Sequence, residues 1–314
     1  MQLLKNRIIL AKVEATYGTD SVPVVATDAL DCRNVKWGAP GEELKRDQIR
    51  GNISQMPSVI GKVYQEVSFD VELKGSGSIG VAGQLSDLLQ ACCLSETVSA
   101  GSSVVYVPAD PNSQKGCTIY VYDLDSGSAV LKKVTGAIGD VTLKLTAGQI
   151  GVLSFSFKGL YNAPTSVALP GTPTYEATTP PIIQSAALSV NAVTTLVSKE
   201  VSIGLKNSIA ERDDISSPYG IKAFFVTSRA PDATIPIEAV LPGTYDPNSL
   251  FVGSTAQALS VVIGTATGNK CTITAPKMIL TKNANGDDGG ILTQDLAFML
   301  GLNAGNDELS IKFQ

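Results

Sequence analysis

Short runs of alternating apolar and polar residues are the dominant pattern of the chain. The clearest runs cover residues 67–74 and 153–158, and shorter ones cover residues 143–145 and 309–313. Glycine, proline, asparagine or aspartate residues separate these runs, as in the glycine-rich residues 75–77. Strands that are half apolar and half polar belong to antiparallel sheets with one face on a core. The pattern therefore predicts a mainly β protein.

A helical period is clear in only one segment, residues 84–94. Apolar residues recur there at i, i+3, i+4, i+7 and i+8, which is one face of an α-helix. These residues are Leu85, Leu88, Leu89, Cys92 and Cys93. The sequence thus predicts at least one α-helix that flanks the β structure.

A change in composition divides the chain near its middle. Residues 163–181 hold five prolines and a single charged residue. Proline restricts itself and its predecessor to extended conformations. We therefore expect a linker or an extended crossover at residues 166–181, between an N-terminal β domain at 1–165 and a C-terminal β domain at 182–314.

The two halves resemble each other at a spacing of 166 residues. An ungapped shift by this amount places Val35 on Val201, Gly38 on Gly204, and residues 46–49 on residues 212–215. In both halves a strand leads into a charged segment and then into an alternating strand. We interpret the similarity as a tandem duplication of one β domain, with chance similarity as the alternative.

Composition excludes several classes of function. The chain has 314 residues and no histidine, which rules out Ser-His-Asp and Cys-His catalysis and His-ligated metal sites. Its 24 basic and 29 acidic residues give a formal net charge of −5, which argues against binding to the phosphate backbone of a nucleic acid. Charged residues make up only 17% of the chain and mean hydropathy is +0.16. A surface with so few charges favours self-association.

Cysteine usage and hydropathy predict the compartment. The five cysteines show no CxxC spacing, which favours buried free thiols in a reducing compartment. No apolar run approaches the ~20 residues that span a bilayer. We expect a soluble chain that is made in a cytoplasm and does not insert into membranes.

The motifs that could carry chemistry are weak. Residues 75–80 match a Gly-x-Gly-x-x-Gly pattern, but the surroundings favour antiparallel strands, so we interpret them as a flexible loop. Acidic pairs occur at residues 213–214, 287–288 and 123/125 without a metal-loop spacing, which favours turn carboxylates. The sequence predicts neither an enzyme nor a cofactor, metal or catalytic site.

A charged segment at residues 41–62 has mixed signs and little apolar patterning. Long loops inside a compact domain are commonly functional or disordered. Mixed charges can align copies of one protein, because positive residues of one copy then contact negative residues of the next. The candidate contact residues here are Glu43, Lys45, Arg46, Asp47 and Arg50. In the second half, at residues 206–222, they are Glu211, Arg212, Asp213 and Asp214.

Three segments carry a resemblance to a known family. Residues 10–23 (Leu-Ala-Lys-Val-Glu-Ala-Thr-Tyr-Gly-Thr-Asp, then Val-Pro), residues 146–161 and residues 269–313 resemble tail tube (major tail) proteins of long-tailed, non-contractile, siphovirus-type bacteriophages. The three segments touch both halves of the chain.

The resemblance implies two tail-tube-like β-sandwich or barrel domains. Proteins of this family form rings that stack into a hollow tube in the virion tail, and the genome passes through this tube into the host. A duplicated chain would form a trimer acting as a pseudo-hexameric ring. The family's long inter-strand loop carries ring-to-ring contacts, which places that role on residues 41–62. The implied partners are further copies of the chain, the tail tip, the tape measure and the tail terminator. The second half departs from the pattern, because its helix is reduced to residues 246–251.

A tube for DNA needs a wall that does not bind its cargo, so DNA should pass without specific binding. We expect Asp70, Glu72 and Glu238, on the polar faces of strands, to face the lumen. Two other classes stay open. One is a tail-associated or capsid-decorating β-sandwich that never polymerises. The other is a carbohydrate-binding sandwich, for which the single tryptophan, Trp37, offers little platform.

Overall fold

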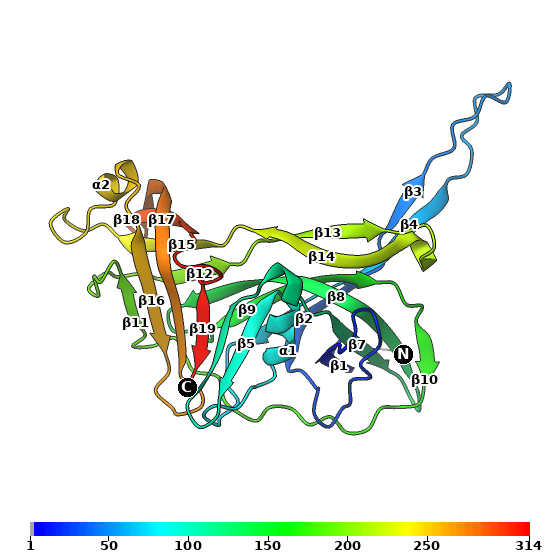
Figure 1. The fold of residues 1–314 in the computed structure, drawn as a ribbon, viewed down its shortest axis with the longest axis horizontal. Helices are drawn as coiled ribbons and strands as arrows, with labels where there is room; N and C mark the ends of the chain where they lie inside the picture. Colours follow the sequence, from blue (N-terminus) through cyan, green and yellow to red (C-terminus); the bar gives the residue numbers. More distant parts are fainter. Residues whose placement is uncertain (1–2) are drawn as a thin grey trace.

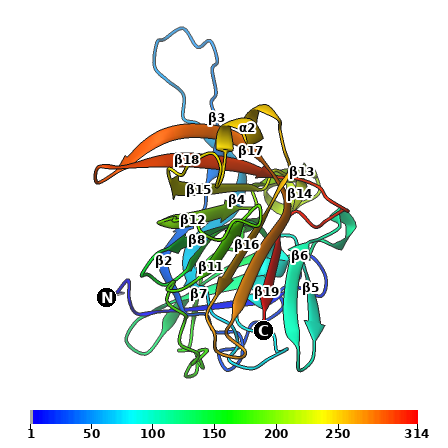
Figure 2. The ribbon, with the colours of Figure 1, turned by 90° about the vertical axis from the view of Figure 1, so that its left-hand side faces the viewer.

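The structure is a computed structural model that describes residues 3–314. Over this part the chain is mainly β, with two α-helices, α1 (Ser86–Ala91) and α2 (Pro247–Val252). The fold class predicted from the alternation pattern is therefore confirmed. The figures show the strands as a broad two-layered body from which hairpins project (Figures 1 and 2).

The strands fall into two series along the chain. In the first half they are β1 (Arg7–Val13), β2 (Cys32–Gly38), β3 (Gly41–Leu44), β4 (Val59–Glu72), β5 (Leu94–Ser99), β6 (Ser103–Pro108), β7 (Cys117–Leu124), β8 (Ala129–Thr146), β9 (Val152–Leu160) and β10 (Thr165–Val167). In the second half they are β11 (Ala187–Val190), β12 (Glu200–Gly204), β13 (Asn207–Asp213), β14 (Ile221–Arg229), β15 (Asp232–Glu238), β16 (Gln257–Ile263), β17 (Cys271–Asp288), β18 (Ile291–Leu300) and β19 (Ser310–Phe313).

One layer is a sheet that runs through both halves, here called the large sheet. Its strands follow one another, each antiparallel to the next, in the order β2, β4, β9, β8, β12, β15, β18, β17. The other layer has one part with β1, β7, β8 and β10 and another with β11, β16, β17, β19, β6 and β5. β8 and β17 are each 18 residues long and take part in both layers. These two strands therefore hold the layers together.

The hydrophobic core lies between the layers. On β4 the odd-numbered residues point inward, and Val67, Phe69 and Val71 are at most 2% exposed. Phe69 packs on Phe155 and Phe157 of β9, with ring centroids 6.0 and 5.8 Å apart. Buried residues of both halves belong to one continuous cluster. The period-two alternation thus assigns one face of each large-sheet strand to this core.

The strand pairings of the first half recur in the second. β1–β7, β2–β4, β4–β9, β7–β8, β8–β9 and β8–β10 have counterparts in β11–β16, β12–β15, β15–β18, β16–β17, β17–β18 and β17–β19. Over residues 32–72 a shift of 166 also reproduces the register. The opposed pairs Cys32/Val71, Trp37/Val67, Gly38/Glu66, Gly41/Val63 and Glu43/Ile60 become Ser198/Ile237, Ile203/Ala233, Gly204/Asp232, Asn207/Arg229 and Ile209/Val226.

The predicted helix at residues 84–94 is shorter than its apolar spacing suggested. α1 ends at Ala91 because Cys93 adopts a left-handed conformation, with φ +63°. Leu94 then begins β5, opposite Pro108 of β6. Cys92, Cys93 and Leu94 are all buried, but by a turn and a strand, so their helix-like spacing is coincidental.

The second helix is not reduced relative to the first, contrary to the expectation. α2 has six residues, as α1 does. The Asp246 carboxylate caps its first turn, accepting hydrogen bonds from the backbone N–H groups of Asn248 and Ser249 at 3.1 and 3.2 Å. Proline at the first helical position suits this start, because that residue has no intrahelical N–H bond to lose.

The proline-rich segment forms an extended crossover. After β10, residues 168–181 contain neither helix nor strand and run along one side of the body toward β11 (Figure 1). Three hydrogen bonds hold the segment on the body. The Thr174 backbone N–H donates to the Val25 carbonyl at 3.0 Å, and the Lys74 ammonium donates to the Glu176 carbonyl at 2.8 Å. The third runs from the Asn269 side chain to a carbonyl in the same segment, at 2.8 Å.

Replacement of Asp87 by asparagine should change how stability depends on pH. Burial raises the pKa of the Asp87 carboxyl to about 6, although the Val13 N–H donates to it. Because the folded pKa lies above the ordinary value of 3.8, this group favours folding below pH 4, and that contribution is lost as the pH rises through 6. We expect Asp87→Asn to be equal in stability to the parent at pH 4 and more stable by roughly 2 kcal/mol at pH 7, since one pKa unit is about 1.4 kcal/mol and the side chain is partly exposed.

Urea unfolding of the unassembled chain at pH 4, 5.5 and 7 measures this difference. A stability difference that stays constant over the three pH values would contradict the assignment.

Candidate functional surfaces

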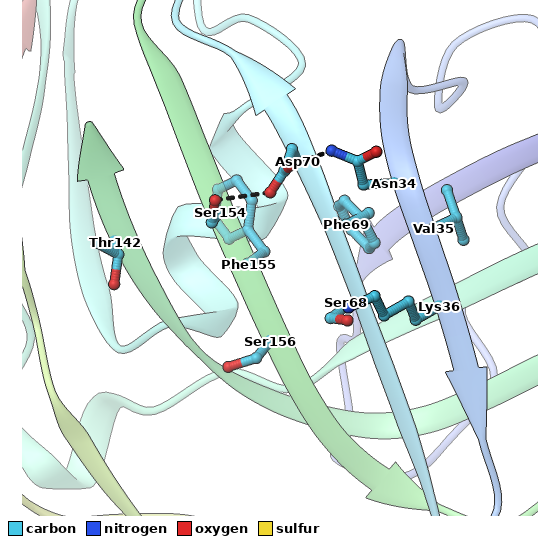
Figure 3. A pocket seen from close by; sticks show the side chains of 10 residues that line it. All are labelled: Asn34, Val35, Lys36, Ser68, Phe69, Asp70, Thr142, Ser154, Phe155 and Ser156. Carbon is cyan, nitrogen blue, oxygen red and sulfur yellow. Dashed lines mark hydrogen bonds between the residues drawn. The ribbon is translucent and has the colours of Figure 1, made fainter. Parts of the chain in front are cut away.

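The face of the large sheet that points away from the core is mainly polar, with a few apolar residues such as Pro236, Ala297 and Met299 among the polar ones. Small side chains from four adjacent strands line its centre, and Figure 3 shows them beside an open depression of about 660 Å³. The small polar residues there are Asn34, Ser68, Thr142, Ser154 and Ser156. Ser68, Thr142, Ser154 and Ser156 each alternate along their strands with core residues, so this part of the face follows directly from the period-two pattern.

Asp70 lies at the centre of this face. The Asn34 side-chain amide donates to one of its carboxylate oxygens at 2.6 Å, and the Ser154 hydroxyl donates to the other at 2.6 Å (Figure 3). Asn34 sits where the β2–β4 register shifts, with φ +57°, which brings its amide over the neighbouring strand. Asp70 is thus held rigidly across three strands.

Glu72 and Glu238 also lie on this polar face. They are half-buried and occupy equivalent ends of β4 and β15, 166 residues apart. Acidic residues outnumber basic ones on the face. The acidic residues include Glu66, Asp70, Glu72, Asp140, Glu200, Asp232, Glu238 and Asp295, and the basic ones include Arg33, Lys36, Lys144, Lys158 and Lys282.

Two basic side chains on this face have acidic neighbours. Lys144 lies 3.2 Å from Glu200, and Lys158 lies 3.6 Å from Glu66. The other basic residues of the face, Arg33, Lys36 and Lys282, lie on its two outermost strands, β2 and β17. Within the described residues, positive charge is therefore paired at the centre of the face and unpaired only toward its edges.

The segment at residues 41–62 is a hairpin whose two ends pair as strands and whose long tip is irregular. β3 pairs with the start of β4, and the residues between them, 45–58, extend far from the body (Figures 1 and 2). We call these residues the arm. Lys45, Arg46, Asp47 and Arg50 on the arm are all exposed, as is Glu43 on β3.

The second charged segment is the hairpin β13–β14, which reproduces the β3–β4 register. Glu211, Arg212 and Asp213 lie exposed on β13, and Asp214 follows half-buried. The Ser216 hydroxyl and backbone N–H hydrogen-bond Asp214, which lowers its pKa to about 2.

An ion pair joins the two charged segments within one chain. The Lys62 ammonium, at the base of the arm, lies 2.7 Å from Asp213 and 4.0 Å from Glu211. Tyr161 and Tyr219 pack edge to face close by, with ring centroids 4.9 Å apart. The fold thus brings the two predicted contact segments together, and Asp213 and Glu211 brace the arm instead of standing free.

The large sheet has two free edges. In the described part of the chain β2 is paired only with β4, and residues 282–288 of β17 are paired only with β18. Figure 2 shows β17 and β18 reaching out from the body as a long hairpin. Free edges expose backbone N–H and C=O groups that can pair with another chain.

The remaining groups that could carry chemistry include the cysteines and the acidic turn residues. Within residues 3–314 no group of three or more His, Cys, Asp or Glu side chains could hold a metal ion, and no helix is long and apolar enough to cross a membrane. All five cysteines are free. Burial raises the pKa of Cys32 and Cys271 to about 12, so these thiols resist ionisation. Asp287 accepts from the Gly290 N–H at 2.8 Å, as a turn carboxylate does.

Sequence reasoning missed two features of these surfaces. The first is the pair of hydrogen bonds that holds Asp70, because Asn34 and Ser154 come from distant parts of the chain. The serines at 154 and 156 were visible as the polar half of an alternating run. The second is the pair of free edges, for which no sequence signal exists apart from the repeat.

Comparison with protein families identifies a similarity over most of the chain. The chain matches the family model described as "Phage tail tube protein" over residues 5–300. No curated protein matches it.

Proposed function

The chain belongs to the phage tail tube protein family, and from this premise we propose that it polymerises into stacked rings that form a hollow tail tube. The tube would belong to the virion of a long-tailed, non-contractile phage and would conduct the genome into the bacterial host. The chain would be synthesised in the host cytoplasm and act as a structural protein with no enzymatic role.

The repeated strand pairing is the observation that carries this proposal. Two four-stranded units, β2-β4-β9-β8 and β12-β15-β18-β17, lie side by side in one sheet. Each unit has its own second layer and its own charged hairpin. A chain that holds two such units behaves as two adjacent subunits of a ring, so three chains supply six units. We therefore propose a trimer that acts as a pseudo-hexameric ring, made of domains 1–165 and 182–314 with a crossover between them.

The polar face of the large sheet supplies the wall of the channel. The opposite face is covered by the second layer, so only the polar face remains to line an interior. Asp70, Glu72 and Glu238 would then face the lumen. An acid-rich, hydrated wall lets a polyanion pass without specific binding.

The arm supplies contacts between stacked rings. It projects beyond the body, and its exposed side chains have both signs, which suits a repeated head-to-tail interface. Partners at the ends and inside of such a tube would be the tail tip, the tail terminator and the tape measure protein.

Negative-stain electron microscopy of the purified chain over a series of concentrations and ionic strengths tests the proposal. Rings or hollow tubes with three-fold repetition support it. Rings of six whole chains would be consistent with the proposed tube but would overturn the proposal that three chains form a pseudo-hexameric ring. Monomers that remain monomers after addition of purified tail tips would favour a tail-associated or capsid-decorating protein instead.

Arg46→Glu should shorten tubes while leaving the chain folded. Reversal of an exposed charge at the arm places like charges opposite each other in the next ring, and such a reversal costs little within the monomer. We expect the mass of sedimented tube to fall severalfold, because an exposed charge pair is worth up to about 1 kcal/mol.

Lys5→Glu, an exposed reversal outside the arm, provides the matched control. Tubes of normal length with Arg46→Glu would remove the arm from the stacking role.

A phage whose tube carries both Glu72→Lys and Glu238→Lys should eject its DNA more slowly. Six added positive charges per trimeric ring would attract the passing backbone, and the delay should shrink as salt rises because the attraction is screened. Ejection triggered in vitro and followed by a DNA-binding dye measures the rate.

The neutral variants Glu72→Gln and Glu238→Gln separate attraction from loss of the carboxylates. Unchanged ejection by intact lysine-bearing tails would show that these residues do not line the channel.

A further inference from the structure

The large sheet ends in two edges of different sequence, and the repeat within the chain shows how they fit. We propose that residues 284–288 of β17 pair antiparallel with residues 34–38 of β2 from a second copy, in a fixed register. We also propose that Lys36 of that copy meets Asp288 across the joint. This inference rests on the proposed ring, and it specifies the contact between chains that the ring needs.

The joint between the two halves of one chain is the template. There β12 pairs antiparallel with the end of β8, so that Gly204 lies opposite Thr142, Ile203 opposite Leu143, and Glu200 opposite Thr146. This joint places the first strand of the second unit against the last strand of the first. The same relation between neighbouring chains would place β2 against β17.

The equivalent residues follow from the pairings across each unit. Phe69 lies opposite Phe155, which lies opposite Val141 of β8. At the shift of 166, Ile235 lies opposite Leu296, which lies opposite Asn283 of β17. Asn283 therefore occupies the position of Val141.

Two strand positions further on, Asn285 occupies the position of Leu143, which faces Ile203 in the internal joint. Trp37 is the equivalent of Ile203. The pairs expected between chains are thus Gly38/Ala284, Trp37/Asn285, Lys36/Gly286, Val35/Asp287 and Asn34/Asp288.

The partial burial of two apolar residues on β2 supports the proposal that a strand of a second copy covers this edge. In the internal joint Val201 and Ile203 are 6% and 2% exposed. Their equivalents Val35 and Trp37 are only partly buried in the single chain. A neighbouring strand along β2 would cover them, as β8 covers β12.

The chemistry of the two joints differs. The internal joint buries Leu143 and Leu145 against Val201 and Ile203. The equivalents of the two leucines on β17 are Asn285 and Asp287, which are exposed. The joint between chains is therefore the more polar one, and it depends more on main-chain pairing and on charge.

A charge pair across this joint is available on the polar face. Lys36 is exposed and would lie opposite Gly286, one face position from Asp288, within the reach of long side chains on diagonal neighbours. In the single chain Asp288 lies 2.9 Å from Lys199, with half of its side chain exposed. Asp295 of β18 adds a second carboxylate beside Gly286. Such a joint should weaken as salt rises, because salt screens the charge pair.

Cross-linking of engineered cysteines tests the register. Gly38→Cys with Ala284→Cys places two thiols opposite each other, and a Cβ atom at either position has room. All variants carry Cys32→Ser, which installs the residue found at the equivalent position 198. A short bis-thiosulfonate reagent is added to assembled tubes, and products are separated on denaturing gels.

We expect covalent products that end at three chains, because a closed trimer has three such joints. The matched control, Gly38→Cys with Leu292→Cys, places the second thiol on an exposed position of β18, one strand away from the joint, and should give few cross-links. Tubes that form normally but cross-link no better at 38/284 than at 38/292 would overturn this joint and leave the proposed tube intact. A chain that assembles under none of these conditions, tail tips included, would overturn both.

A charge exchange tests the ion pair separately. Lys36→Glu should reduce tube yield at least several-fold at low salt, and Asp288→Lys in the same chain should restore it. Both side chains are exposed, so circular dichroism of the unassembled variants should match the parent. Equal yields for the parent and Lys36→Glu, or failure of the second change to restore a lost yield, would exclude this pair.

Discussion

The pairing of β8 with β12 is the interaction on which the rest of the structure depends. It joins a four-stranded unit of each half into one sheet, and it satisfies backbone groups that would otherwise be two more open edges. It also brings both charged hairpins to the same side of the chain, where Lys62 pairs with Asp213. The pairing of β6 with β19 joins the halves in the second layer, but only the β8–β12 joint makes the large sheet continuous.

A sheet with one buried face and two open ends sets strong limits on what the molecule can do. The buried face belongs to the core between the layers, so chemistry is restricted to the polar face, the edges and the hairpins. At the centre of the polar face the side chains around Asp70 are short, and the nearby Lys144 has Glu200 as an acidic neighbour. Such a surface suits a lining better than a binding site. In the proposed tube, the open depression beside Asp70 is part of the channel wall.

The two halves have the same pairing but different tasks. The arm after β3 stands free, whereas β13–β14 is a tightly paired hairpin that supports the base of the arm. The internal joint is apolar on its core side, whereas the corresponding residues of β17, Asn285 and Asp287, are polar. The two joints can differ in this way because the internal joint forms between strands of one chain and needs only to be stable. In the proposed ring the joint between β2 and β17 forms only when separate chains assemble, and a polar contact suits this step better.

The sequence by itself determined the class of structure, the repeat and the side of each strand that meets the core. Period-two alternation is a local property, so Phe69 and Asp70 could be assigned to opposite faces without any knowledge of their partners. The spacing of 166 residues predicted equivalent positions that the strand register reproduces, because duplicated chains retain their pairing. Helix length was beyond the sequence, since Cys92 and Cys93 are apolar at helical spacing yet are buried by a turn. Only the tertiary structure decided that Asn34 and Ser154 hold Asp70 and that Lys62 braces the second hairpin. It also showed that β2 and β17 are the two open edges. These features depend on which distant strands lie side by side, and long-range pairing leaves no periodic mark in the chain.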